Sequence, residues 1–287
     1  MPKLPSEVLS SVFYLYGTRE AAEKGESFGG TGFLVSYPTG LPDGSSFVYG
    51  VTNWHVAVQS GASVVRLNKI GGGVDGIELD PADWDFKPQW HDLAVASIPL
   101  SQEVHQIKSL GLAMLLSDTD ILKYGIGPGD DVFMVGRFVD HDGSESNVTA
   151  VRFGNISTMP QSIRQNTGST EKSFIIDMHS RTGYSGSPLF VYRTIGTDLT
   201  AKPLEIGPDK MFLKVLGIHW GQFPELWEIR TGAEPLPHGA EISADSKYVT
   251  GMSGMTLAIP AWEIRNLLEM PSLRQQRART LATIAKS

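Results

Sequence analysis

Short apolar runs, each closed off by turn-forming residues, constrain the fold of this chain most. The runs are roughly five or six residues long and are bounded by Gly, Pro, Asp or Asn, which is typical of β-strands. In the N-terminal half they cover residues 11–16, 32–36, 46–51, 63–67 and 93–98. In the C-terminal half they cover residues 131–135, 148–153, 173–178, 188–192, 211–218 and 255–259. The pattern predicts an all-β fold.

The two halves have similar strand content, which favours two stacked β-barrels. Residues 112–123 have the character of a linker with one helical turn and lead into the glycine-rich cluster 125–129, so we expect the boundary near residue 120. We therefore expect an N-terminal β-barrel over residues 8–120 and a C-terminal β-barrel over residues 121–259. A C-terminal helix and basic tail are expected over residues 260–287.

The predicted helix covers residues 260–269. Ile264, Leu267 and Leu268 fall on one helical face, and Pro260 stands at the start, where a proline is tolerated. Pro271 is expected to end this helix. The tail beyond it has a helical apolar stripe and is expected to form a terminal helix that is partly docked and partly frayed.

Composition excludes several classes of function. The formal net charge of −7 argues against non-specific binding to nucleic acid, which needs clustered Lys and Arg. The chain has 0 Cys, so it has no disulfide, no thiolate nucleophile and no Cys-ligated metal. No stretch approaches the ~20 apolar residues of a membrane helix. The apolar run 8–16 is too short for a signal peptide. We expect a cytoplasmic protein without a membrane or nucleic-acid partner.

A candidate nucleophile lies in residues 183–188, Gly-Tyr-Ser-Gly-Ser-Pro. Glycines on both sides of Ser185 let the backbone turn sharply, which leaves nearby N–H groups pointing at one spot beside the hydroxyl. Such a spot can hold the oxyanion of a tetrahedral intermediate. A serine hydroxyl is a weak nucleophile and needs a neighbouring base, usually histidine. A glycine-flanked serine alone is also common in ordinary loops.

His55 and Asp92 are the candidate partners of this serine. His55 follows a β-like run, and Asp92 stands directly before the apolar run 93–98. Taken singly, His55 could be a structural histidine and Asp92 a strand-end residue. Their occurrence with Ser185 in the order His, Asp, Ser, each in a specific local context, favours a catalytic triad.

The sequence resembles the trypsin-like, chymotrypsin-fold serine proteases, and within them the bacterial branch that includes the Deg-type proteases. The order His, Asp, Ser is the order of that family. The resemblance covers roughly residues 10 to 270. The segments that carry it are residues 29–35, 52–56, 92–95, 128–136, 183–188, 217–221 and 256–260.

The resemblance implies two six-stranded antiparallel barrels, with the catalytic groups in the cleft between them. Ser185 would be the nucleophile, His55 the general base, and Asp92 the residue that orients His55. The N–H groups of Gly183 and Ser185 would form the oxyanion hole. The substrate-binding residues would be His179, at the base of the specificity pocket, and the strand His219, Trp220 and Gly221. The implied reaction is endopeptidase cleavage of a protein or peptide substrate, without cofactor or metal.

Three positions depart from the trypsin pattern. Tyr184 stands where trypsin carries the aspartate that pairs with a newly cleaved N-terminus, so we expect no activation by N-terminal cleavage. His179 stands where trypsin carries an acidic group, so we expect no preference for Arg or Lys substrates. His219 replaces a small residue on the substrate strand, and both histidines could instead make only local hydrogen bonds.

Several alternatives stay open at this point. Asp85 is the second candidate for the triad acid, and His91 is either exposed or helps to fix the Asp92 loop. Residues 140–145 have some likeness to a calcium loop, with a solvated hairpin tip as the simpler interpretation. The long connections 193–210 and 222–251 are typical of loops that set specificity. The rival functions are a peptide-binding module that does not cut, and a protease that is activated by a partner on its long loops or basic tail, or by a further C-terminal module.

Overall fold

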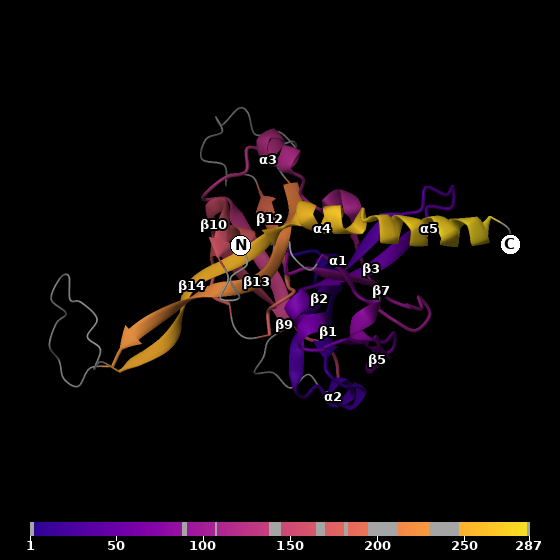
Figure 1. The fold of residues 1–287 in the computed structure, drawn as a ribbon, viewed down its shortest axis with the longest axis horizontal. Coiled ribbons are helices and arrows are strands. Elements are labelled where there is room, and N and C mark those ends of the chain that lie inside the picture. The colour runs from indigo at the N-terminus through magenta and orange to yellow at the C-terminus, as the bar shows by residue number, and fades with distance from the viewer. Residues whose placement is uncertain are drawn as a thin grey trace.

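The computed structural model describes residues 3–87, 91–106, 108–137, 145–164, 170–180, 183–194, 212–229 and 247–285 (Figure 1). Its helices and helical turns are α1 (Ser6–Leu9), α2 (Arg19–Lys24), η1 (His55–Gln59), η2 (Pro81–Asp83), η3 (Leu112–Met114), α3 (Asp118–Tyr124), α4 (Ala261–Leu268) and α5 (Pro271–Ile284). The strands of the first half are β1 (Val12–Tyr16), β2 (Phe28–Pro38), β3 (Ser46–Thr52), β4 (Val64–Asn68), β5 (Val74–Glu78), β6 (Asp85–Phe86), β7 (Ala94–Ser97) and β8 (Leu110–Gly111). Those of the second half are β9 (Asp131–Arg137), β10 (Thr149–Arg164), β11 (Thr170–Asp177), β12 (Pro188–Arg193), β13 (Phe212–Glu228) and β14 (Tyr248–Pro260).

The first half forms one 8-stranded sheet in the order β5-β4-β1-β2-β3-β7-β6, with β8 pairing to β2. The expectation for this half was a barrel of six strands. The difference comes from β6 and β8, each of 2 residues, which are too short to produce an apolar pattern that the sequence could reveal. Among the described residues, the hydrogen-bonded strand path of this sheet ends at β5 and β6.

The strand β1 is buried on both faces of the first sheet. Along β1, Phe13 and Leu15 pack into one apolar cluster, while Tyr14 and Tyr16 pack into another. This alternation follows from the strand geometry, in which successive side chains point to opposite faces. It explains why the run reads as continuously apolar and aromatic rather than as alternating apolar and polar residues.

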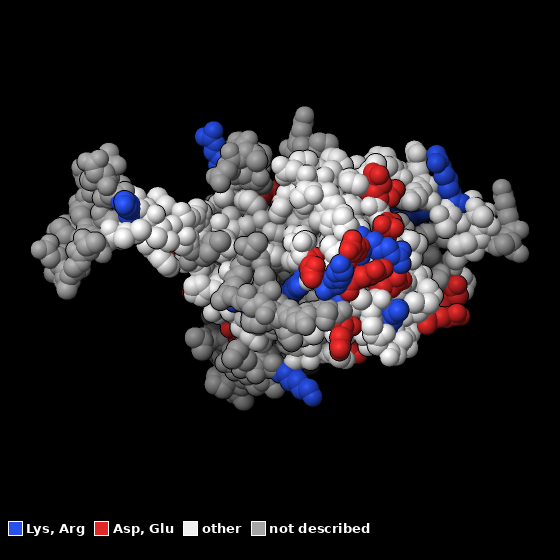
Figure 2. Space-filling view, turned by 90° about the horizontal axis from the view of Figure 1, so that it is seen from below, with Lys and Arg blue, Asp and Glu red and all other residues white. Residues whose placement is uncertain are grey.

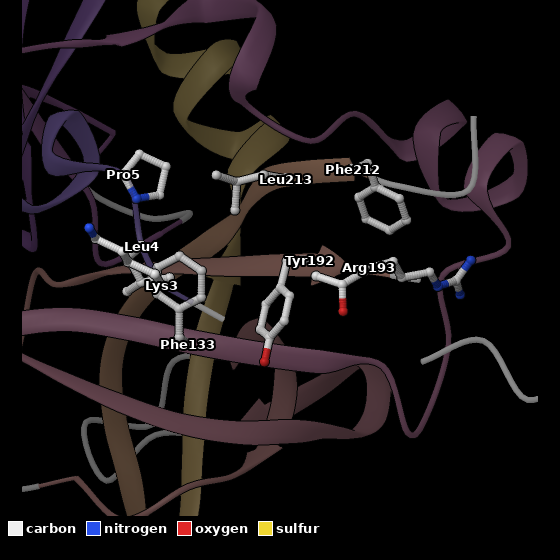
Figure 3. Close-up of a pocket in the computed structure, with 9 residues that line it drawn as sticks. Lys3, Leu4, Pro5, Phe133, Tyr192, Arg193, Phe212 and Leu213 are labelled. Carbon is white, nitrogen blue, oxygen red and sulfur yellow. The ribbon is translucent and has the colours of Figure 1, made fainter. Parts of the chain in front are cut away.

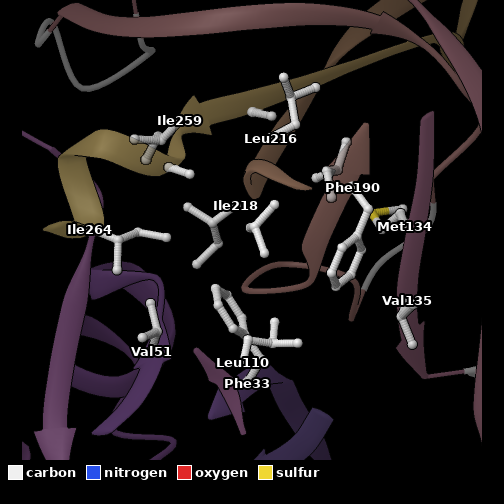
Figure 4. Packing of buried hydrophobic residues seen from close by; sticks show 14 of the residues in the cluster. Phe33, Val51, Leu110, Met134, Val135, Phe190, Leu216, Ile218, Ile259 and Ile264 are labelled. Atoms are coloured by element: carbon white, nitrogen blue, oxygen red, sulfur yellow. The ribbon is translucent and has the colours of Figure 1, made fainter. Parts of the chain in front are cut away.

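The second half closes into a barrel in the order β10-β11-β14-β13-β12-β9. The all-β fold with C-terminal helices is confirmed, and the second half forms the expected six-stranded barrel. One cluster of buried side chains fills this barrel and continues into the first sheet. Figure 4 shows Phe33 and Leu110 of the first half close to Ile218 and Phe190 of the second half. The two halves therefore share an apolar core.

α4 packs against β13 and β14, and α5 lies across the first sheet near β3 (Figure 1). α4 buries Ile264, Leu267 and Leu268, the predicted apolar face. Pro271 follows the end of this helix, as expected, and it also begins α5. At the start of a helix, the missing N–H of a proline costs no hydrogen bond. In α5 the guanidinium of Arg277 is buried and lies 4.0 Å from the ring centroid of Tyr37.

The two ends of the expected long loop 222–251 are instead β-structure, and residues 230–246 lie outside the described residues. β13 and β14 continue as a two-stranded ribbon that extends away from the body (Figure 1), with Trp227 opposite Val249. Pro224 and Gly251 interrupt the apolar pattern of these strands, so the sequence reads as a loop. Most of the connection 193–210 and nearly all of residues 140–145 lie outside the described residues.

Charged side chains of both signs are interspersed on the face that bears α2 (Figure 2). On α2, Arg19 pairs with Glu23, and Lys24 pairs with Glu20. The described residues on this face therefore form no uninterrupted basic surface of the kind that binds nucleic acid. Within the described part of the chain, no helix combines the length and apolar character needed to cross a membrane.

Candidate active site

The pairing of β3 with β7 brings His55 to Asp92. These strands are antiparallel, with Thr52 opposite Ala94, so the residues that follow β3 and those that precede β7 meet at one end of the sheet. The backbone N–H of His55 donates to Asp92 Oδ1 at 2.8 Å, and the ring Nδ1 donates to Asp92 Oδ2 at 2.5 Å. A carboxylate only accepts hydrogen bonds, so Nδ1 carries the proton and Nε2 is left as the acceptor.

The side chains of His55 and Asp92 differ in their exposure to solvent. The Asp92 side chain is 9% exposed, and that of His55 is 36% exposed. Asn53 fixes the aspartate further, because its Nδ2 donates to the Asp92 carbonyl at 2.8 Å. The arrangement protects the carboxylate from water and leaves the imidazole open to an incoming group.

The Ser185 loop is held by the glycine-rich segment of β2. Thr31 N–H donates to the Ser185 carbonyl at 2.8 Å, and the Thr31 hydroxyl donates to the Gly183 carbonyl at 2.9 Å. Gly186 has φ +87°, and a Cβ at this position would lie 1.8 Å from the Thr31 carbonyl oxygen. Only glycine fits this position, both for its backbone conformation and for its closeness to β2.

Gly30 of β2 lies between the histidine turn and the serine loop. A Cβ at this position would lie 2.5 Å from Val56 Cγ1 and 3.2 Å from the Ser185 carbonyl oxygen. One glycine thus contacts both the residue after His55 and the serine itself. No hydrogen bond joins the Ser185 hydroxyl to His55, although both residues belong to the described part of the chain.

The predicted oxyanion donors belong to the same turn. Gly183 has φ +94°, a left-handed conformation that favours glycine. Among the described residues, neither the Gly183 N–H nor the Ser185 N–H donates to another group. The oxyanion role of these two groups stays a prediction, since residues 181–182 lie outside the described residues.

Of the predicted substrate-binding residues, His179 is exposed and His219 is buried. The His179 ring lies against Gly254, where an added Cβ would approach its Cε1 to 3.2 Å. The His219 ring donates from Nδ1 to the Leu257 carbonyl at 3.2 Å and accepts at Nε2 from the Ser180 hydroxyl at 2.9 Å. Burial lowers the pKa of His219 to about 4, so this ring is neutral at physiological pH.

Trp220 and Gly221 lie where β13 pairs irregularly with β14. His219 pairs with Ala258 and Gly221 with Leu257, so Trp220 is the extra residue of a β-bulge. The Trp220 Nε1 donates to the Ser173 hydroxyl at 2.8 Å. A Cβ at position 221 would meet no atom within 4 Å. The substrate-binding role of the four residues stays a prediction.

The alternative triad acid, Asp85, lies elsewhere in the first sheet. It belongs to β6 and accepts a hydrogen bond from the Ser272 hydroxyl at 3.2 Å. Among the described residues, no group of acidic, histidine or cysteine side chains could hold a metal ion. A pocket of about 290 Å³ is lined by residues 3–5 and by side chains of β9, β12 and β13 (Figure 3), and it includes none of the predicted site residues.

Sequence reasoning missed one polar cluster beside the site. His91, Glu171 of β11 and Glu263 of α4 are hydrogen-bonded together, and the Asp92 N–H donates to Glu171 Oε2 at 2.9 Å. The only sequence signal was the position of His91 directly before Asp92. The acidic partners stand far away in the sequence, and neither belongs to a motif.

Tyr184 is fully buried beneath the serine loop. Its ring packs on Gly136 of β9, where a Cβ would lie 2.6 Å from the ring, and the Arg152 guanidinium lies 4.9 Å from the ring centroid. The Tyr184 hydroxyl has no hydrogen-bond partner among the described residues. The Tyr184 side chain therefore supports the turn by packing and contributes no carboxylate of its own.

We expect Tyr184→Ala to lower the free energy of unfolding by about 3–5 kcal/mol, as other large aromatic truncations in cores do. Tyr184→Phe removes only the hydroxyl, which makes no hydrogen bond among the described residues, and is expected to be close to neutral. Chemical denaturation of both variants measures the difference. A Tyr184→Phe variant as unstable as Tyr184→Ala would contradict the packing role.

Comparison with known proteins gives one family. A sequence model described as a trypsin-like peptidase domain matches residues 30–194, more than half of the 287 residues, and this segment contains His55, Asp92 and Ser185. A comparison with curated protein sequences found no match.

Among solved structures, the MamO protease domain from Magnetospirillum magneticum matches with 16% identity and a TM-score of 0.49, over 93% of this chain and 100% of that chain. Deg5 matches with 19% identity and a TM-score of 0.42, over 75% of this chain and 81% of that chain. The inactive form of the Rv3671c protease matches with 16% identity and a TM-score of 0.45, over 92% of this chain and 89% of that chain.

Proposed function

The chain belongs to the family of trypsin-like peptidase domains, and on that premise we propose that it is a serine endopeptidase. The observation that carries the proposal is the hydrogen-bonded pair of His55 and Asp92, with the basic Nε2 of His55 left free. The contact of Gly30 with both Val56 and Ser185 supports the assignment of Ser185 as the nucleophile. The proposed substrate is a protein or peptide, and the reaction uses no cofactor.

In the first half of the proposed reaction, Ser185 Oγ attacks the carbonyl carbon of the scissile peptide bond, and its proton passes to His55 Nε2. The carbonyl oxygen takes the negative charge and accepts hydrogen bonds from the Gly183 and Ser185 N–H groups. The intermediate then collapses. The C–N bond breaks, His55 gives its proton to the leaving amine, and an acyl-enzyme remains on Ser185.

In the second half, a water molecule attacks the acyl carbon and gives its proton to His55. The C–O bond to Ser185 breaks, and the hydroxyl recovers the proton from His55. Asp92 stays ionised throughout and stabilises the imidazolium that forms twice in each cycle. The substrate backbone would pair with the strand segment 219–221, with side-chain selection near His179.

A second candidate function is peptide binding without cleavage. The observation that favours it is the absence of a hydrogen bond between the described residues Ser185 and His55. Catalytic hydrogen bonds are often long in free enzymes and tighten only with substrate, so this absence does not exclude catalysis. A partner that engages the long loops or the basic tail could also bring the serine into place, which keeps partner activation within the proposal.

Profiling with a peptide library tests the proposal and separates these alternatives. We expect the intact wild-type chain to generate new peptide termini that the Ser185→Ala variant does not generate. Peptides retained on the wild-type chain without new termini would instead support the binding module. Cleavage that begins only when a second protein is added would support partner activation.

The same library is expected to reveal no preference for Arg or Lys before the cleaved bond. A buried substrate cation needs a compensating carboxylate, since an unpaired charge is costly to bury. The segments 179–185, 217–221 and 252–256, which form the pocket by family resemblance, contain no Asp or Glu. The matched variant His179→Asp is expected to raise cleavage after Arg and Lys. A wild-type profile dominated by Arg and Lys would overturn this assignment of the pocket.

We also expect the chain to need no N-terminal cleavage for activity. Tyr184 offers no carboxylate to a new α-amino group, and its buried ring supports the turn without one. The measurement compares the activity of the intact chain, verified by mass spectrometry, with that of the same chain after limited proteolysis. Strong activation that follows one new N-terminus between residues 20 and 30 would contradict this expectation.

A further inference from the structure

A histidine held between two carboxylates lies directly beside the proposed triad acid. The His91 Nδ1 bonds Glu171 Oε1 at 2.5 Å, and its Nε2 lies 3.2 Å from Glu263 Oε2. The three side chains are 19%, 1% and 16% exposed, in the order His91, Glu171, Glu263. They come from three different parts of the chain: the loop before β7, the strand β11, and the helix α4.

The geometry identifies the charge of this histidine. A carboxylate accepts hydrogen bonds, and a neutral imidazole has only one N–H, so an imidazole bonded through both nitrogens to carboxylates must be the cation. Glu171 is almost fully buried and needs this positive partner, because an unpaired buried carboxylate is costly. Burial by itself would lower the pKa of His91, but the hydrogen bonds to Glu171 and Glu263 outweigh it and raise the pKa to about 9.

Glu171 connects this cation to the triad. Its Oε1 accepts from His91, while its Oε2 accepts from the backbone N–H of Asp92 at 2.9 Å. The remaining polar groups of Asp92 are also engaged, the carbonyl by Asn53 and both carboxylate oxygens by His55. The bond from Glu171 is therefore the contact that ties the Asp92 backbone to the second barrel.

We propose that Glu171 and His91 are positioning residues for Asp92, and that Glu263 of α4 fixes them in place. The inference rests on the proposed peptidase function. Glu171 sets the position of the Asp92 backbone, and through it the direction in which the His55 ring presents Nε2 to Ser185. His91 bonds Glu171 and holds its orientation, so the second barrel and the C-terminal helix both take part in aligning the catalytic acid.

Substitution at Glu171 tests the hydrogen bond. Glu171→Gln keeps an oxygen acceptor for the Asp92 N–H, whereas Glu171→Ala removes it. Because small misplacements of catalytic groups cost about 10²-fold, we expect Glu171→Ala to lower kcat on this order with KM unchanged, and Glu171→Gln to restore most of the loss. The matched control is His105→Gln, a buried histidine bonded to Asp75 at 3.0 Å that contacts none of the proposed catalytic residues. Equal kcat in all three variants would overturn the proposal.

The pH dependence of kcat tests the role of His91. The charged groups that face its ring are Glu171 from β11 and Glu263 from α4. Its pKa is raised from 6.5 to about 9, so the ion pair stabilises the fold fully below pH 6.5 and is lost as the pH rises through about 9. We expect kcat to fall with this loss. The fall should be absent in His91→Gln and should begin at lower pH in Glu263→Gln, which retains the histidine and serves if His91→Gln does not fold.

NMR of the histidine rings separates this proposal from the peptidase function, because it needs no turnover. We expect the His55 ring signals, which report the hydrogen bond to Asp92, to change at the pH where His91 loses its proton. This step should be absent in His91→Gln. If the wild type cleaves nothing while the two rings change together, the peptidase function fails and the positioning role stands. If His91 titrates without any change at His55 or in kcat, the positioning role is wrong.

Discussion

Replacing Ser185 with alanine is expected to abolish peptidase activity while leaving the fold intact. The substitution removes the proposed nucleophile, and loss of a triad residue lowers kcat by at least about 10⁴-fold. The Ser185 backbone keeps its bonds to β2, since Thr31 N–H donates to the carbonyl rather than to the hydroxyl. Initial rates on the best library peptide, together with a denaturation curve, measure both expectations.

His55→Ala is the companion variant to Ser185→Ala. Because base and nucleophile act as a unit, the double variant is expected to be no slower than either single variant. Ser187 stands two residues after Ser185 and is the neighbouring serine with which Ser185 can be compared as the nucleophile. The hydroxyl of Ser187 is fully buried. Near-normal turnover in a clean Ser185→Ala preparation would show that another group is the nucleophile.

Asp92→Asn is expected to lower kcat by about 10⁴-fold, with the structure unchanged. Asparagine has nearly the shape of aspartate, but its NH₂ group donates where the carboxylate accepts. The imidazole would then carry its proton on Nε2, where it cannot take a proton from Ser185. The expected signature is a large loss of kcat with little change in KM or in the free energy of unfolding.

Asp85→Asn is the matched control for Asp92→Asn. Asp85 stands only a few residues earlier, yet its described side-chain bond goes to Ser272 of α5 at 3.2 Å. We expect activity within about 2-fold of the wild type, as for surface substitutions away from special features. If Asp85→Asn is the more damaging of the two, the wrong acid has been assigned.

Local sequence patterns were sufficient to predict most of the strands. The runs that became β1, β3, β4 and β7 contribute apolar side chains to both clusters and are bounded by turn residues, so neighbouring residues alone identify them. The family predicted from the short motifs is confirmed by the match to residues 30–194. Strands with weak apolar patterns, such as β5 and the outer parts of β13 and β14, were not predicted, because their pairing depends on partners that the local sequence does not reveal.

The pairing of His55 with Asp92 could be predicted because each residue belongs to a short motif at a strand end. The contacts of Glu171 could not, since 79 residues separate it from Asp92 and only the packing of the two halves against each other brings them together. The burial of His219 could not be predicted either, because it depends on the bulge at Trp220 and on the hydrogen bond with Ser180. The type and the sequence position of a residue are enough to identify the groups that react. The residues that hold those groups in place are brought together by tertiary packing, which the local sequence does not reveal.

Labelling of the intact chain with a fluorophosphonate tests the central claim most directly. The probe reacts when a serine hydroxyl, activated by a histidine, attacks phosphorus and expels fluoride, so it reports the nucleophile and its base without knowledge of the substrate. We predict one covalent adduct, located by peptide mapping at Ser185, absent in Ser185→Ala and strongly reduced in His55→Ala. A folded wild-type chain that acquires no adduct, or acquires it at another serine, would contradict the account.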